Sequence, residues 1–208
     1  MPGLYIITGS NGAGKSTIGP NYLPAEINER CIVFDGDLLY TQKLKELFPA
    51  IVKSAKYARQ EAFDFVVEQF EQQTNDAIER NVDYVYEGHF TNEETWETPK
   101  AFKEAGYRIS LIFFGLENPE LSQFRVTERV AEGGHYVDPN TLRNNYYGNL
   151  EKLDAHYNLI DDLTIVDTSQ INHQVLFKTV SGQIEYHVDK SELPGWFTQY
   201  LPTITSLF

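Results

Sequence analysis

The stretch ITGSNGAGKST, residues 7–17, restricts the possible folds more than any other part of the chain. It contains the P-loop spacing Gly9-x-x-x-x-Gly14-Lys15-Ser16. In such a loop, backbone N–H groups surround a phosphate, the lysine reaches the β- and γ-phosphate oxygens, and the hydroxyl binds Mg²⁺. A P-loop needs a buried strand before it, and the apolar run at residues 4–7 predicts that strand. The alternative is a glycine-rich turn with a solvated lysine.

We expect this loop to bind ATP together with Mg²⁺, with Ser16 as the metal ligand. Pro20 lies about one turn into the following helix, and Pro24 comes soon after, so we expect that helix to be kinked or short. The N–H groups that face phosphate precede Pro20 and remain available. The predicted nucleotide contacts in the loop are Gly9, Asn11, Gly12, Ala13, Gly14, Lys15, Ser16 and Thr17.

Composition narrows the class of protein. The chain has 208 residues with 41% hydrophobic residues, which is enough for a packed α/β domain. The formal net charge of −13 repels a polyphosphate backbone, so we expect no nucleic-acid partner. Cys31 is the single cysteine and excludes an intramolecular disulfide. With no 18-residue apolar run and no apparent signal peptide, we expect a cytoplasmic protein without membrane contact.

Five apolar runs alternate with helical patterns and predict a mainly parallel five-stranded sheet with helices on both faces. A helical pattern from Ile51 to Ile78 separates the second and third runs. Ligands bind at the carboxyl ends of strands in such sheets. The predicted fold is therefore a three-layer P-loop NTPase sandwich. The predicted strands are residues 4–8, 30–37, 82–89, 107–115 and 163–168.

The C-terminal part differs from the rest. Two alternating runs joined by Ser181-Gly182 predict a β-hairpin, which either extends the sheet or covers its edge. We therefore divide the chain into a P-loop kinase-like core at 1–170 and a C-terminal hairpin extension at 171–208.

Two acids follow the second predicted strand. Asp35 and Asp37 are two residues apart and share one face of an extended segment. If the bound phosphate is transferred to a substrate hydroxyl, a carboxylate must lie within hydrogen-bond reach of that hydroxyl, and Asp37 is our candidate for this general base. Asp35 is a candidate contact for substrate or Mg²⁺. The alternative is that Asp37 only caps the helix that begins at Leu38.

A second acidic position follows the third predicted strand. Glu87 precedes Gly88, where a ligand can approach the backbone. Glu87 is a candidate for substrate binding, for holding the water shell of a metal, or for a plain loop acid. Thr91 is a candidate substrate contact in the same loop, whereas the lone His89 is more typical of a structural residue.

Arginines are concentrated after the fourth predicted strand. Asn118-Pro119 predicts a helix start, and Arg125 and Arg129 then lie four residues apart on one helix face. Together with a second helix opening at 138–139, this segment predicts a lid at about 117–150. We expect Arg125 and Arg129 to bind nucleotide phosphate and Arg129 to act in catalysis. Arg143 is a further candidate, and pairing of these arginines with nearby glutamates is the alternative.

These motifs together resemble the zeta-toxin-like P-loop kinases, in the branch often labelled predicted ABC-type ATPase. The resemblance spans roughly residues 3–170, with RVAEGGH at 129–135 as its most specific part. It implies ATP- and Mg²⁺-dependent phosphorylation of a UDP-N-acetyl amino sugar, a base resembling Asp37 and a substrate glutamate resembling Glu87. The same resemblance makes an antitoxin-like protein a candidate partner. One departure is Asn145, because the branch usually has an arginine before the aromatic residue of the second lid helix.

The sequence therefore predicts an ATP-dependent phosphotransferase that acts on a hydroxyl of a small molecule. Two alternatives stay open at this point. One is a P-loop NTPase that acts as a nucleotide-dependent switch on a protein. The other is a lapsed enzyme retained as a binding module, which Asn145 brings into consideration.

Overall fold

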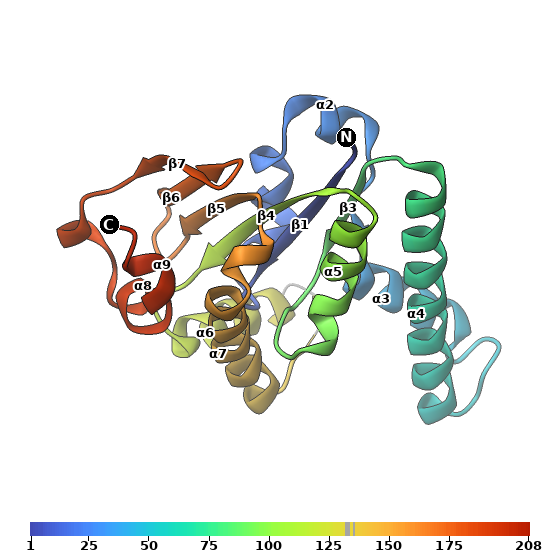
Figure 1. Ribbon diagram of the computed structural model, residues 1–208. Coiled ribbons are helices and arrows are strands. Elements are labelled where there is room, and N and C mark those ends of the chain that lie inside the picture. Colours follow the sequence, from blue (N-terminus) through green and yellow to red (C-terminus); the bar gives the residue numbers. More distant parts are fainter. Residues whose placement is uncertain (132–133, 135) are drawn as a thin grey trace.

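The computed structural model describes residues 1–131, 134 and 136–208 (Figure 1). Its centre is one seven-stranded sheet in the order β2-β3-β1-β4-β5-β6-β7. Strands β1 to β5 are parallel to one another, whereas β6 runs antiparallel to β5 and β7 runs antiparallel to β6. The strands are β1 (Gly3–Gly9), β2 (Phe34–Asp35), β3 (Tyr84–Glu87), β4 (Arg108–Gly115), β5 (Asp162–Asp167), β6 (Gln174–Val180) and β7 (Gln183–His187).

Helices pack on both faces of this sheet and complete the predicted three-layer α/β sandwich (Figure 1). The longer helices are α3 (Gly36–Leu47), α4 (Ala55–Arg80), α5 (Glu97–Glu104), α6 (Pro119–Ala131) and α7 (Pro139–Ala155). The shorter ones are α1 (Lys15–Ile18), α2 (Ala25–Arg30), α8 (Gly195–Tyr200) and α9 (Pro202–Thr205), with 3₁₀ turns at Gly19–Tyr22, Glu94–Trp96, Tyr157–Leu159 and Lys190–Glu192. None of the helices in the described part of the chain is long and apolar enough to cross a membrane.

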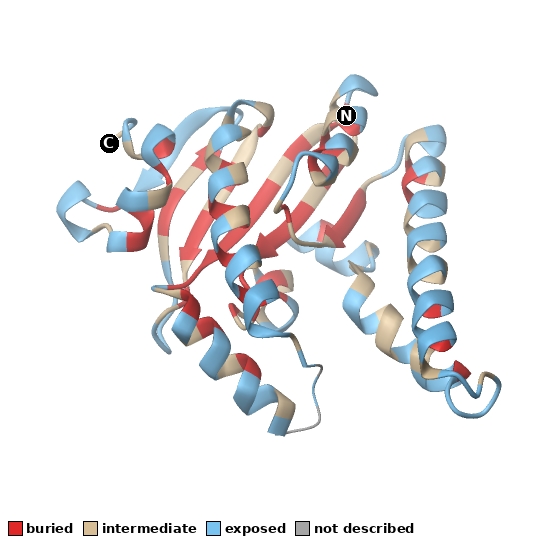
Figure 2. Cartoon of the chain, turned by 90° about the horizontal axis from the view of Figure 1, so that it is seen from below, coloured by how far each residue is buried: buried red, intermediate tan, exposed pale blue. Residues whose placement is uncertain are grey.

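The hydrophobic core lies along the central strands, which Figure 2 shows as the most buried part of the molecule. In β4 the five residues from Leu111 to Gly115 are all buried, as expected for a strand covered on both faces. Tyr22 packs edge-on against Phe114 on one face, and Trp196 packs against Phe113 on the other. The core therefore ties the segment after the P-loop and the C-terminal helices to the same strand.

The predicted parallel strands are present, but the second is much shorter than residues 30–37. Only Phe34 and Asp35 pair with β3, because Asp35 caps a helix that begins at Gly36. The long helix predicted from Ile51 also begins later than the sequence pattern indicates. Ile51 lies in a turn with 70% of its surface exposed, and α4 begins at Ala55 after the separate helix α3. As predicted, the helix after the P-loop is short, and Pro20 stands in the 3₁₀ turn that follows it.

The C-terminal hairpin extends the sheet, which decides between the two predicted alternatives. Strand β6 pairs with β5 and β7 pairs with β6. Ser181 and Gly182 both have positive φ, 52° and 71°, as a two-residue type I′ hairpin turn requires. Leu176 and Phe177 of β6 belong to the same buried cluster as β1 and β4. The division into units at residue 170 stays a prediction.

Candidate active site

The P-loop connects the end of β1 to the start of α1 at the carboxyl edge of the sheet. Gly9, Gly12 and Gly14 all have positive φ, at 136°, 73° and 87°, so the loop turns in a way that favours glycine at each position. A Cβ atom at Gly9 would lie 2.2 Å from the carbonyl oxygen of Phe114. The backbone is thus shaped as an anion cradle at a helix N-terminus, which fits the phosphates of a nucleotide.

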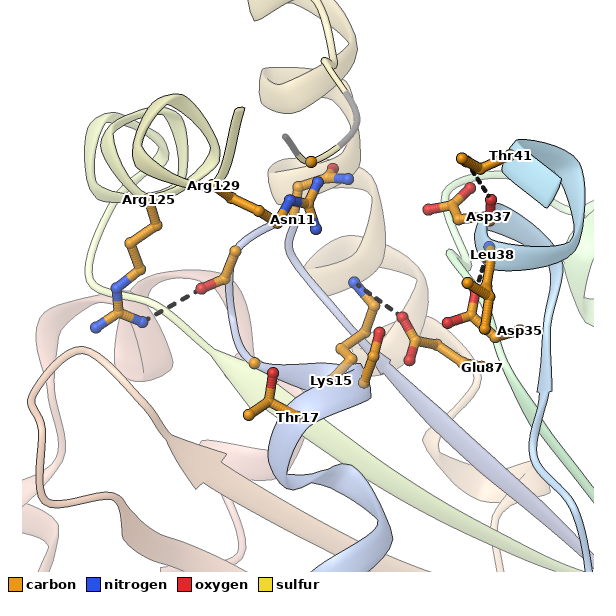
Figure 3. A pocket seen from close by; sticks show the side chains of 14 residues that line it. Asn11, Lys15, Thr17, Asp35, Asp37, Leu38, Thr41, Glu87, Arg125 and Arg129 are labelled. Carbon is orange, nitrogen blue, oxygen red and sulfur yellow. Dashed lines mark hydrogen bonds and ion pairs between the residues drawn. The ribbon is translucent and has the colours of Figure 1, made fainter. Parts of the chain in front are cut away.

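Lys15 is buried in this cradle, with only 7% of its side chain exposed. Its Nζ donates hydrogen bonds to the carbonyl oxygens of Gly9 and Ser10, both at 3.1 Å, and lies 3.9 Å from Oε1 of Glu87 (Figure 3). Burial lowers the pKa of Lys15, and the nearby Glu87 carboxylate opposes this shift. A buried cation with flexible reach is suited to bind a phosphate oxygen that enters the cradle.

Glu87 lies beside the P-loop rather than out in the loop that follows β3. Burial raises its pKa, while the charge of Lys15 and a hydrogen bond with Ser16 act in the opposite direction. Asp35 stands opposite it as its β2 partner in the strand register. The contact with Lys15 and Ser16 favours a role near phosphate and metal over that of a plain loop acid.

The oxygen atoms near Ser16 are compatible with Mg²⁺. Among the described residues, no group of three or more His, Cys, Asp or Glu is arranged to hold a metal ion. Magnesium at phosphate sites usually keeps several waters and uses one or two protein oxygens besides the substrate phosphates. The exposed hydroxyl of Ser16, adjacent to the Glu87 carboxylate, fits that mode of binding.

Asp35 and Asp37 differ in what they do for the local fold. The Asp35 side chain accepts a hydrogen bond of 2.9 Å from the backbone N–H of Leu38 and caps α3. The capping role that the sequence assigned to Asp37 as an alternative thus belongs to Asp35. Asp37 lies in the first turn of α3, and its side chain lines the same cavity as Lys15 (Figure 3).

The arginines of α6 face the P-loop. Arg125 donates hydrogen bonds to the carbonyl oxygens of Gly12 at 3.3 Å and Ser169 at 3.1 Å. Arg129, one turn later, lines the cavity on the same side (Figure 3). Arg143 lies elsewhere, because it pairs with Glu120 at 2.9 Å and keeps 57% of its side chain exposed. Two of the three candidate arginines therefore border the site.

The helix starts predicted for the lid are confirmed. Asn118 Oδ1 accepts a hydrogen bond from the N–H of Leu121, and Asp138 caps α7 through the N–H groups of Asn140 and Thr141. Within the RVAEGGH stretch at 129–135, residues 132, 133 and 135 lie outside the described residues. Gly134 is described, and its N–H donates to the Arg129 carbonyl oxygen at 2.8 Å. Motion of the lid stays a prediction.

Two neighbouring cavities share one cluster of charged side chains. A cavity of about 500 Å³ is bordered by the P-loop, the start of α3, and Arg125 and Arg129. A second, of about 440 Å³, is bordered by α3 and α4. The residues common to both are Lys15, Asp35, Asp37 and Glu87. A phosphate donor on one side and an acceptor on the other would thus meet at these four side chains.

Thr91 lines neither of these cavities. It packs against α7, where a Cβ on Gly148 would come within 2.9 Å of the Thr91 Cβ. Its assignment as a substrate contact finds no support in this position. Sequence spacing placed it near Glu87, but the chain turns toward α7 after Gly88.

Sequence reasoning did not find Asn149, which is only 1% exposed. Its Oδ1 accepts hydrogen bonds from the Phe90 N–H at 2.6 Å and the Thr8 hydroxyl at 3.2 Å. Its Nδ2 donates to the Asn145 carbonyl oxygen and lies 3.2 Å from Nδ1 of His89. This one side chain joins α7 to the end of β1 and to the loop after β3. The sequence signal that points to such a residue is an asparagine among the apolar residues of one helix face, because a buried amide needs hydrogen-bond partners.

Asn145 and His89 belong to the same network. Asn145 Nδ2 donates to Oδ1 of Asn11 at 2.8 Å, so it touches the P-loop through a side chain. Burial lowers the pKa of His89 well below its usual value, against an opposing hydrogen bond with Gly9. A neutral, hydrogen-bonded His89 agrees with the structural role expected from the sequence. Asn145 therefore contacts the P-loop directly, at the position where the resemblance implies an arginine.

Comparisons with known proteins agree with this arrangement. A chain of the PezAT chromosomal toxin–antitoxin system of Streptococcus pneumoniae is 20% identical, with a TM-score of 0.62, over 88% of this chain and 75% of that one. AvrRxo1-ORF1:-ORF2 solved with ATP matches at 17% identity and a TM-score of 0.68, over 97% of this chain and 64% of that one. A putative kinase from Chloroflexus aurantiacus matches at 18% identity and a TM-score of 0.56, over 82% and 89%.

At these identities the structural neighbours support the P-loop kinase fold alone. The chain spans less than two thirds of the AvrRxo1 chain that it matches. No match to a curated protein was found. The model of the zeta toxin family, in contrast, matches residues 1–179. Because that match covers most of the chain, the protein belongs to the zeta toxin family, as its motifs predicted.

Proposed function

We propose that the protein is an ATP-dependent kinase that phosphorylates a hydroxyl group of a small molecule. The observation that carries this proposal is the pair of cavities that meet at Lys15, Asp35, Asp37 and Glu87. A phosphate cradle alone is compatible with many activities. A second cavity that shares the lysine and the carboxylates provides a place for an acceptor next to the γ-phosphate.

Each side chain has a role in the proposed reaction. The Asp37 carboxylate accepts the proton of the acceptor hydroxyl, whose oxygen bonds to the γ-phosphorus while the bond to the β,γ-bridging oxygen breaks and ADP leaves. Lys15 and Arg129 stabilise the negative charge on the transferred group, and Arg125 holds the loop that binds the phosphates. Mg²⁺, held through Ser16 with Glu87 and Asp35 nearby, would supply further charge neutralisation.

Nucleotide binding is the first test. Lys15→Ala should weaken binding of Mg-ATP at least ~10-fold, because a charge-assisted hydrogen bond is worth about 1.5–3 kcal/mol. Lys56→Ala, an exposed lysine on α4, is the matched control and should bind as wild type does. Equal affinities of wild type and Lys15→Ala for Mg-ATP in titration calorimetry would contradict the proposal.

The base assignment is tested by Asp37→Asn, which preserves the size of the side chain. Loss of a positioned base typically reduces kcat by ~10²–10⁴-fold, and we expect a change in that range with an unchanged circular dichroism spectrum. The acceptor is first detected by incubating the protein with γ-labelled ATP and a metabolite extract. An unchanged kcat on that acceptor rejects Asp37 as the base.

The same incubation separates the alternative functions. A labelled small molecule means a kinase, release of free phosphate alone means a switch-type NTPase, and no turnover means a binding module. The family suggests a UDP-N-acetyl amino sugar as the first acceptor to try. An antitoxin-like partner is part of this proposal, because the PezAT neighbour comes from a toxin–antitoxin system. The cytoplasmic location stays a prediction from the sequence.

A further inference from the structure

Helix α7 reaches the P-loop through the side chain of Asn145. Its Nδ2 donates a hydrogen bond of 2.8 Å to Oδ1 of Asn11 in the loop. Asn11 is 5% exposed and lines the cavity of about 500 Å³ that the nucleotide would occupy (Figure 3). Asn145 is not among the described residues that line this cavity. Its influence on a bound nucleotide therefore passes through Asn11.

The place of Asn145 on α7 is fixed by its neighbours. Its backbone carbonyl oxygen accepts a hydrogen bond of 2.5 Å from Nδ2 of Asn149, which is itself bound to the end of β1 and to the loop after β3. The next residue, Tyr146, is 1% exposed, and its hydroxyl lies 3.0 and 3.1 Å from the carbonyl oxygens of Leu116 and Glu117. The helix therefore holds the Asn145 amide against the P-loop from a firmly packed position.

The backbone of Asn11 is held from the side of α6. Its carbonyl oxygen accepts a hydrogen bond of 2.7 Å from the hydroxyl of Ser122, a fully buried residue. At the next position, the carbonyl oxygen of Gly12 accepts a hydrogen bond of 3.3 Å from Arg125. With the main chain held in this way, the freedom left to Asn11 is rotation of its side chain, and above all the exchange of the two ends of its amide.

The two ends of an amide differ in hydrogen-bonding character, because the oxygen accepts and the NH₂ group donates. Asn145 binds the accepting end of Asn11, so the donating end, Nδ2, is the one left for a ligand. Phosphate oxygens at neutral pH accept hydrogen bonds, and bonds to a charged phosphate are stronger than bonds between neutral groups. With the amide reversed, the Asn11 oxygen would face phosphate oxygens, and two acceptors repel each other.

From these contacts we infer that Asn145 is a positioning residue for the phosphate donor, because it holds the Asn11 amide with Nδ2 directed to the phosphates of ATP. The inference rests on the proposed kinase function, which supplies the identity of the bound phosphates. Asn145 makes no contact with the nucleotide and acts by selecting one of two side-chain orientations before the nucleotide binds. Such preorganisation removes part of the cost of binding. A contact that served only to tie α7 to the P-loop would not depend on which end of the amide it binds.

Asn145→Asp tests the inference, because it reverses the hydrogen-bonding character at this position with almost no change in size. A carboxylate only accepts, so Asn11 has to turn Nδ2 toward position 145 and its oxygen toward the phosphates. The hydrogen bond between the two residues is kept, and we expect a thermal midpoint close to that of wild type. The dissociation constant for Mg-ATP, measured by titration calorimetry, should rise ~10–100-fold, as for loss of a charge-assisted hydrogen bond. Asn145→Ala lets the amide adopt both orientations and should raise it only ~2-fold.

Two controls separate the orientation of the amide from the added negative charge. Asn144→Asp places the same charge on the exposed neighbouring residue of α7. In an Asn11→Ala background, Asn145→Asp should weaken Mg-ATP binding no more than Asn144→Asp does. Equal affinities of the two aspartate variants with Asn11 present overturn the inference. A full effect of Asn145→Asp without the Asn11 side chain, or a large loss of stability in Asn145→Asp, also overturns it.

The kinase function is measured separately, as transfer of label from γ-labelled ATP to a small molecule by the wild-type protein. If wild type transfers the label and the two aspartate variants bind Mg-ATP equally well, only the positioning role is lost. If wild type binds Mg-ATP and transfers no label, the kinase function is contradicted, and the affinities of the variants still decide the role of Asn145. If wild type does not bind Mg-ATP, both are contradicted.

Discussion

Asn149→Ala is the substitution whose effect can best be worked out from the structure. The native side chain pairs with the Phe90 N–H and the Thr8 hydroxyl, and both of those residues are 2% exposed. Alanine removes the acceptor from both donors and leaves them buried. An unsatisfied buried donor costs about 1–3 kcal/mol, so two donors suggest ~2–6 kcal/mol. Water entering the space left by the amide would reduce this, and we expect a loss of about 3 kcal/mol.

Urea unfolding followed by tryptophan fluorescence and circular dichroism measures this loss. With a slope of roughly 2–3 kcal/mol per M, the midpoint should fall by about 1 M. Coincidence of the two probes is needed to treat the transition as two-state. Asn145→Ala is the matched control, one turn earlier on α7, because it removes a single side-chain hydrogen bond, to Asn11. It should cost about 1 kcal/mol.

The comparison of these two variants can refute the reasoning. If Asn149→Ala is no more destabilising than Asn145→Ala, the buried donors are satisfied in another way and the network does not hold α7 to the P-loop strand. The expected large difference, together with an increased KM for the acceptor, would show that the network also positions the loop carrying His89 and Phe90.

Two further predictions concern charged residues. Arg129→Ala should lower kcat by ~10²–10³-fold, the usual effect of losing one donor to the transferred phosphoryl group. The control Arg143→Ala should keep kcat within about 2-fold of wild type, because Arg143 pairs with Glu120. Equal kcat values for the two variants would exclude Arg129 from catalysis. Burial raises the pKa of Glu87, so its carboxylate binds a proton more tightly in the folded state than in the unfolded chain. The unfolding free energy of wild type relative to Glu87→Gln should therefore fall as pH rises above 4.5, the ordinary pKa of a glutamate. If chemical denaturation shows this difference increasing with pH, the burial effect is contradicted.

Much of the fold was predictable because its signals are local. The P-loop spacing, the five apolar runs, the Ser181-Gly182 turn and the interruption at Pro20 each depend on a few adjacent residues. Where two local signals competed, the prediction was less accurate. Asp35 and Asp37 are both acceptable helix caps, and only the pairing of β2 with β3 fixes the cap at Asp35.

The candidate site was predictable in part. Lys15, Asp37 and Glu87 could be placed together because the carboxyl ends of parallel strands lie on one edge of the sheet. The network around Asn149 could not, because its partner Thr8 lies 141 residues away in the sequence. For the same reason Arg143 and Thr91, plausible by spacing, point to Glu120 and α7 instead. Which way a side chain points across elements depends on packing that single-sequence patterns do not carry.

The close approach of Gly9 to β4 changes what the first glycine of the P-loop can indicate about ancestry. A side chain at this position would collide with the Phe114 backbone, whether or not a nucleotide ever binds. Selection for folding alone would therefore keep Gly9 in a descendant that had lost catalysis. A Cβ at Gly14 would meet only the side chain of Ile18, at 3.4 Å, but the φ of 87° at this position favours glycine in the same way, with or without a nucleotide. When related chains are sorted into active and lapsed enzymes, loss of Lys15 or Asp37 is therefore the informative change, and retention of Gly9 carries no such information.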